Sequence, residues 1–208
     1  MDFTQADHTF IALRHFENAT DLFFAGTADD VQTYLRGFVY ILHSPLEDGV
    51  ANDPGVTYEI QVSHHASSEQ TWVPIVTLIA STAASTGDAL DDTAAEGQTV
   101  VPVVATTDFT IGSHIYIKDD HDALSAAATG SQFAQVASIS AGVSITVVNN
   151  LEYAFVSGDD VFVGGVQQWV VPVDLEGAAR LRVVVYNADA TGCDWASVAV
   201  AKYATDIE

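Results

Sequence analysis

The chain has 208 residues, and 49% of them are hydrophobic, which excludes a disordered protein. Its 28 acidic residues outnumber 6 basic ones, for a formal net charge of −22, and the basic residues are scattered along the sequence. Direct binding to nucleic acid and binding to anionic membrane surfaces are therefore not expected, because both need clustered Lys and Arg.

Segments with β-strand character dominate the first third of the chain. Residues 56–62 alternate between apolar and polar types, as expected for a strand with one buried face. A single short helical turn is expected at 27–35, because Thr27 can cap it and two aspartates fall in its first turn. Further strands are expected at 10–13, 34–42 and 72–79.

The middle of the chain holds two copies of one short pattern, at 109–117 and 155–163. Each copy has an aromatic residue, a glycine three positions later, and then alternating apolar residues. The glycines, Gly112 and Gly158, are expected to adopt a backbone conformation that other residues resist, and each alternation predicts a strand. The two copies predict a small, internally repeated β-module over about 99–163. The preceding residues, 81–98, are mostly small or polar and predict a linker or a surface excursion.

The last third resembles the first third in one detail that predicts the domain organisation. A Trp-Val-Pro-type strand begins at Trp72, before the module, and a similar one begins at Trp169, after it. Two such strands on either side of a different segment indicate an insertion. We expect residues 1–84 and 166–208 to form one discontinuous β-sandwich domain, and residues 85–165 to form an inserted β-domain with an internal repeat.

Residues with metal-binding or nucleophilic chemistry occur in contexts that favour structural roles. The densest cluster, residues 119–122, has three aspartates around His121, but it lacks the EF-hand spacing, so an exposed acidic loop is favoured over a calcium site. His64 and His65 are adjacent on a strand, so their rings point to opposite faces. Cys193 is the only cysteine, which excludes an intramolecular disulfide, and an inert thiol is favoured over a nucleophile.

Catalytic motifs are absent from the sequence. The pairs Asp91-Asp92 and Asp159-Asp160 lie in predicted turns, where aspartate is favoured for local hydrogen bonding. For the three tryptophans, core packing is favoured over a sugar-binding platform. We therefore predict no enzyme activity, no catalytic, cofactor-binding or metal-binding residues, and no cofactor.

The acidic composition has two interpretations. The first is a surface that favours solubility, and the second is adaptation to high salt, where screening removes the repulsion between like charges. The first residues have no secretory signal, and no apolar run approaches the roughly 20 residues that span a bilayer. The protein is therefore expected to be made in the cytoplasm.

The module over about 99–163 resembles small β-units that recur in structural proteins of tailed bacteriophages and related archaeal viruses. The matching segments are residues 109–117, 137–140, 145–147 and 158–161. The flanking sandwich, with its strand at 181–187, resembles jelly-roll virion proteins of the same viruses, including head decoration (cement) proteins and tail-associated components. No invariant catalytic motif defines that group, so no functional residue is carried over.

This resemblance implies an all-β fold, a jelly-roll-like β-sandwich with an inserted small β-domain. It also implies a non-enzymatic virion protein that assembles in many copies, with capsid decoration or cement as the expected role. The alternative is a tail or fibre component that binds a carbohydrate or a receptor. The expected partners are the major capsid protein, neighbouring virion subunits and copies of the chain itself, with a trimer as one option. The expected location is the virion.

Overall fold

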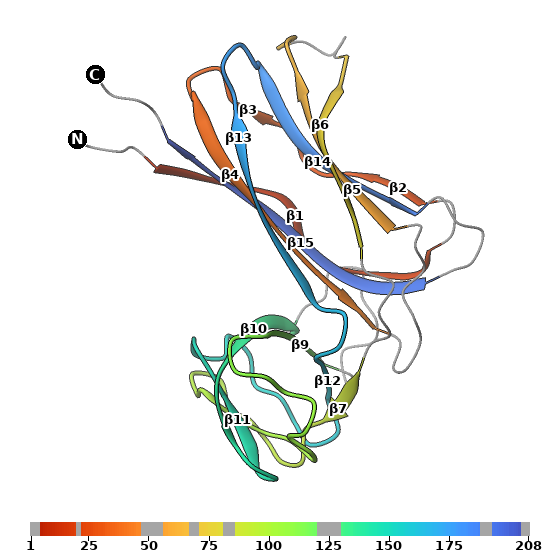
Figure 1. The fold of residues 1–208 in the computed structure, drawn as a ribbon, viewed down its shortest axis with the longest axis vertical. Coiled ribbons are helices and arrows are strands. Elements are labelled where there is room, and N and C mark those ends of the chain that lie inside the picture. Colours follow the sequence, from red (N-terminus) through yellow and green to blue (C-terminus); the bar gives the residue numbers. More distant parts are fainter. Residues whose placement is uncertain are drawn as a thin grey trace.

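The computed structural model describes residues 5–19, 22–46, 56–66, 71–80, 86–119, 130–187 and 193–204. These residues form fifteen β-strands in three antiparallel sheets, and none of them is helical (Figure 1). Two sheets pack face to face in the upper part of the view, and the third lies below them. The predicted all-β class is confirmed.

The upper two sheets form a sandwich with the strand order of a jelly roll. The first sheet runs β1-β15-β4-β13, and the second runs β2-β14-β5-β6, with the short β3 also paired to β14. Besides the short β3, the described residues of the sandwich form eight strands. Numbered from 1 to 8 in chain order, they lie in the order 1-8-3-6 in the first sheet and 2-7-4-5 in the second sheet. This interleaving of two Greek keys defines a jelly roll and confirms the fold class. The strands are β1 (Gln5–Ala19), β2 (Leu22–Ala25), β3 (Asp29–Asp30), β4 (Arg36–Pro45), β5 (Val56–Ser63), β6 (Val73–Ile79), β13 (Gln167–Asp174), β14 (Arg180–Asn187) and β15 (Cys193–Ala204).

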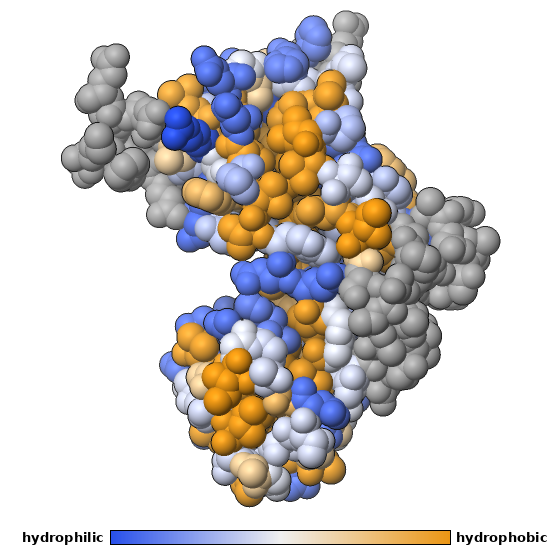
Figure 2. Space-filling view, viewed as in Figure 1, coloured by the Kyte–Doolittle hydropathy of each residue, from blue (hydrophilic) through white to orange (hydrophobic). Residues whose placement is uncertain are grey.

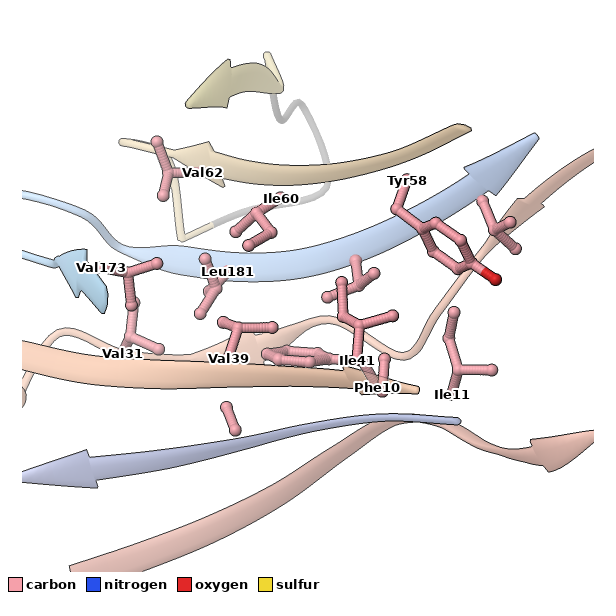
Figure 3. Close-up of a cluster of buried hydrophobic side chains, with 14 of the residues drawn as sticks. Phe10, Ile11, Val31, Val39, Ile41, Tyr58, Ile60, Val62, Val173 and Leu181 are labelled. Atoms are coloured by element: carbon pink, nitrogen blue, oxygen red, sulfur yellow. The ribbon is translucent and has the colours of Figure 1, made fainter. Parts of the chain in front are cut away.

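The core of the sandwich follows from the alternation along these strands. Tyr58 and Ile60 of β5 point toward Val39 and Ile41 of β4 across the space between the sheets (Figure 3). All four side chains are fully buried. Burial of a Val or Ile side chain stabilises a fold by about 1.5–3 kcal/mol. The alternation predicted at 56–62 is therefore confirmed.

The third sheet is inserted between β6 and β13. Its order is β7-β12-β9-β10-β11-β8, and its strands pair only with one another. They are β7 (Gly87–Ala89), β8 (Val100–Pro102), β9 (His114–Lys118), β10 (Gln132–Ser140), β11 (Ser144–Val147) and β12 (Asp160–Phe162). This sheet has its own buried cluster, which includes Leu90, Ile117, Ile145 and Val161.

The two repeated patterns lie side by side in this sheet. Gly112 and Gly158 have φ angles of 89° and 98°, as their place in the pattern predicts. Phe109 and Phe155, the aromatic residues that open the two copies, are both buried in the cluster. The strands that end the copies pair with each other, with Val161 opposite Ile117.

Two local predictions are wrong. The segment 81–98 is not simply a linker: β7 lies within it, and Leu90 and Ala94 are buried, while residues 81–85 lie outside the described part of the chain. The predicted helical turn at 27–35 is replaced by β3 and a tight turn, because the buried Val31 donates its N–H to the carbonyl of Ala179 and accepts from the N–H of Tyr34.

A small junction joins the sandwich to the third sheet. Tyr116 and Phe162 of the third sheet pack with Ala196 of β15, and Leu13 of β1 lies against the same cluster. The Tyr116 hydroxyl also forms a hydrogen bond with Nε2 of His15. Domains are defined by independent folding. The predicted division into one domain of residues 1–84 and 166–208 and a second of residues 85–165 therefore stays a prediction.

Candidate functional site

The predicted metal-binding candidates do not come together in the described residues. Asp119 follows β9, and its N–H donates to Oγ of Ser131, while residues 120–122 lie outside the described part. The ring of His64 bonds the carbonyl of Gly177 at 2.7 Å, and His65 is exposed beside it. Within the described ranges, no group of three or more His, Cys, Asp or Glu side chains could hold a metal ion.

The predicted place of the acidic pairs in turns is wrong for one residue: Asp160 is the first residue of β12. Asp159 accepts a hydrogen bond from the N–H of Val156 at 2.8 Å, and Asp92 accepts one from Thr93 at 2.7 Å. Asp160 lies 3.8 Å from the ammonium of Lys118. Asp92 and Asp159 thus make the local hydrogen bonds that the sequence favoured for them, whereas Asp160 forms an ion pair from within a strand.

The three tryptophans divide between the core and the surface. Trp195 is fully buried and stacks on Phe16 with ring centroids 4.8 Å apart, and Trp169 packs against the same core. Trp72 is not part of that core. The guanidinium carbon of Arg182 lies 4.1 Å from the centroid of its ring. Core packing is thus confirmed for two of the three residues.

Trp72 belongs to a polar row on the outer face of the second sheet, which we call the Glu59 row (Glu59, Gln61, Trp72, Arg182, Tyr186). Nε of Arg182 donates to Gln61 at 2.9 Å, and the Gln61 amide donates to Glu59 at 2.6 Å. The Tyr186 hydroxyl donates to the other oxygen of Glu59 at 3.2 Å. Hydrogen bonds hold the row together, and sequence patterns missed it because its members come from two separate strands and a loop.

The electrostatics of the Glu59 row do not indicate acid–base catalysis. Burial lowers the pKa of Arg182, although the charge of Glu59 opposes this effect. Burial and then the charge of Glu59 raise the pKa of Tyr186, which keeps its hydroxyl a donor. Glycosidases of the common type need two carboxyl groups, and this row contains one, with both oxygens already accepting hydrogen bonds.

The outer face of the first sheet carries an apolar band. Its residues lie opposite one another in register on β15, β4 and β13, and they are Phe38, Tyr40, Leu42, Val170, Pro172, Val198 and Val200. Phe38 and Val170 each remain 48% exposed. At one end, Arg36 and Lys202 flank a pocket of about 210 Å³ with Phe38 and Tyr40 in its lining.

The same face continues from the apolar band into the junction. Ala196 precedes Val198 by two residues on β15, so its side chain points outward like those of the band. It is nevertheless fully buried, because residues of the third sheet pack against it. The inserted segment thus already occupies one end of this apolar face. The rest of the band is uncovered, and apolar side chains reach the surface on both parts of the molecule (Figure 2).

Comparisons with known proteins identify no family. No protein-family model matches the chain, and no curated protein matches its sequence. Among solved structures, the SPBc2 prophage-derived protein YomS is similar over 98% of this chain and 96% of its own, with 8% identity and a TM-score of 0.33. Disulfide-linked pili that form Bacillus endospore appendages match over 99% and 93%, with 7% identity and a TM-score of 0.33.

The VP2 subviral particle of infectious bursal disease virus is also similar, over 98% of this chain and 41% of the viral one, with 10% identity and a TM-score of 0.26. We draw no functional conclusion from likenesses at these TM-scores. A search of the described residues for a helix long and apolar enough to cross a membrane finds none.

Proposed function

We propose that the chain is a non-enzymatic structural protein that assembles in many copies on the particle of a tailed virus, as a capsid decoration or cement protein. Its partners are then the major capsid protein, neighbouring subunits and other copies of the chain. The observation that carries the proposal is the uncovered apolar band, together with its continuation into a junction that the third sheet covers.

The apolar band has the chemistry of an interface. Soluble monomers rarely expose large contiguous apolar areas, and those that do commonly bind a partner there. A standard interface buries about 800 Å² on each partner, an area that one face of a small sandwich can supply.

Association through side chains is favoured over addition of a strand. The two edge strands nearest the insertion, β6 and β13, carry Pro74 and Pro172, which have no N–H to donate to an added strand. Strand addition is thereby disfavoured at these two edges, and the faces of the sandwich remain available for assembly. Many weak contacts of this kind on one particle add up through avidity.

Binding to capsids tests this proposal. Purified protein mixed with bare expanded capsids should bind in a ratio set by the capsid symmetry. The double variant Phe38→Glu and Val170→Glu should reduce that binding by at least about tenfold, because it places charges in the interface. A matched control is Ile111→Glu, on a turn of the third sheet where the side chain is 64% exposed. Failure of the wild-type protein to bind capsids or tails would contradict the proposal.

The Glu59 row favours a second candidate, the tail or fibre component that binds a carbohydrate. Sugars are bound by aromatic rings beside planar polar groups, and Trp72 lies beside Arg182, which donates to Gln61. In a glycan-array experiment, a bound glycan should be lost in Trp72→Ala, with Trp fluorescence of Trp195 showing that the core is intact. A wild-type protein that binds no glycan would remove this candidate.

A further inference from the structure

A groove lies where the sandwich opens between β1 and β2. It has a volume of about 400 Å³, and its lining includes Phe10, Leu13, Phe24 and Thr27 around Arg14. Volumes of about 300–1,000 Å³ are usual for small-molecule sites. The groove is separate from the apolar band and from the Glu59 row.

The backbone around the groove is irregular in a way that fixes its walls. The pairing of β1 with β15 shifts register on both sides of Ile11, and such bulges redirect neighbouring side chains. On the other wall, the N–H of Thr27 donates to the carbonyl of Phe10 at 2.9 Å. Gly26 permits this approach, because a Cβ there would lie 2.5 Å from the Phe10 oxygen.

Arg14 is the charged residue in the lining of this groove. Its guanidinium carbon lies 4.4 Å from the ring centroid of Phe24 and 5.1 Å from that of Phe16. Its Nε is buried and has no hydrogen-bond acceptor. Among the side chains that the structure describes, no carboxylate forms an ion pair with it.

The described side chains that line the groove around Arg14 are mostly apolar, although the chain as a whole has 28 acidic residues and 6 basic ones. Lys118 and Lys202 each have an acidic partner, in Asp160 and Asp7. A buried N–H without an acceptor is unfavourable, so the guanidinium of Arg14 has unused capacity for hydrogen bonds.

We propose that this groove binds a small apolar carboxylate, a carboxyl group attached to a hydrocarbon or aryl chain. The rings of Phe16 and Phe24 lie on one side of the guanidinium, because their centroids are only 5.6 Å apart, and the two terminal nitrogens can form the two parallel N–H···O bonds that a carboxylate accepts. The apolar lining then receives the hydrocarbon part. This site is independent of the proposed assembly role.

Titration with 4-phenylbutyrate, followed by amide NMR in 0.15 M salt, tests the proposal; at that ionic strength the repulsion from the net negative charge is screened beyond about 8 Å. The acid should shift the amide signals of Ala12, Leu13 and Thr27, and the neutral analogue 4-phenylbutan-1-ol should bind at least about tenfold more weakly. Arg14→Gln should weaken binding of the acid to the level of the alcohol.

Two further variants control for folding and for charge. Arg14→Lys keeps the positive charge but loses the paired donors, so its affinity should fall between those of the wild type and Arg14→Gln. Arg36→Gln, outside the groove, should leave the affinity unchanged. The proposal is overturned if the acid causes no shifts, if the alcohol binds as tightly, or if a peptide with one glutamate between leucines binds while the acid does not.

Discussion

The buried histidine His43 shows how one residue can set the response of the whole sandwich to acid. Its Nδ1 lies 2.8 Å from the hydroxyl of Tyr58, and its ring packs near Trp169. Complete burial lowers the pKa of His43 to about 3, from an ordinary value of 6.5. The imidazole is therefore neutral in the folded protein throughout the range in which an unfolded chain would protonate it.

This difference predicts a loss of stability on acidification. The unfolded state gains a proton on His43 below pH 6.5 and the folded state does so only near pH 3, so the free energy of unfolding falls between these values. At pH 5 the contribution is about 2 kcal/mol. Urea unfolding at pH 7 and pH 5 should show a smaller fall for His43→Gln than for the wild type. The exposed His64→Gln is the control, and equal falls in all three proteins would contradict the assignment.

At the level of elements, the repeated pattern of the third sheet depends on its glycines. Gly112 and Gly158 have positive φ angles, and a Cβ at either position would meet nothing within 4 Å. Glycine is therefore needed at these positions for its backbone conformation and not for lack of space. A side chain there would destabilise the fold only through the strain of a positive φ angle.

Substitutions at Gly112 should separate backbone preference from packing. Gly112→Ala should destabilise the fold by about 1–2 kcal/mol, and Gly112→Asn by less, because asparagine tolerates the left-handed region. Gly26→Ala is the contrasting case, since its Cβ would collide with backbone atoms, and it should cost more than either. Guanidinium unfolding of the three variants measures the order. An Asn variant less stable than the Ala variant would contradict this explanation.

The elements that could be predicted are those with a strong local signal. The alternation at 56–62 and the glycine patterns each fall within a few residues, and the structure confirms both. The segment 81–98 gave no such signal. Its strand β7 is only Gly-Asp-Ala, and Ala94 fills a core position with a single methyl group while its N–H and carbonyl both pair with Phe155. The Glu59 row was equally hidden, since Gln61 and Arg182 are 121 positions apart in sequence.

At the scale of the whole molecule, the insertion predicts two folding units. The third sheet has its own strands and its own buried cluster, and among the described residues the cluster around Tyr116 and Phe162 joins it to the sandwich. Residues 85–165, produced alone, should therefore give a dispersed amide NMR spectrum typical of a folded protein. A collapsed spectrum would show that the division into domains is wrong.

The full chain offers a second test of this division, because all three tryptophans lie in the sandwich. Tryptophan fluorescence should report unfolding of the sandwich, and far-UV circular dichroism should report both parts. Tyr116→Phe removes the hydrogen bond to His15, so it should separate the two transitions further. Coincident transitions in the wild type and the variant would indicate a single cooperative unit.

The pairing of β1 with β15 has a mechanical consequence. Gln5 lies opposite Ala204 in this ladder, so the first and last described residues are neighbours at one end of the sandwich, away from the third sheet (Figure 1). A force applied between these two points would peel β1 from β15 one hydrogen bond at a time, instead of shearing the whole ladder at once. The third sheet lies outside that path, and it would stay unloaded until the sandwich itself had opened.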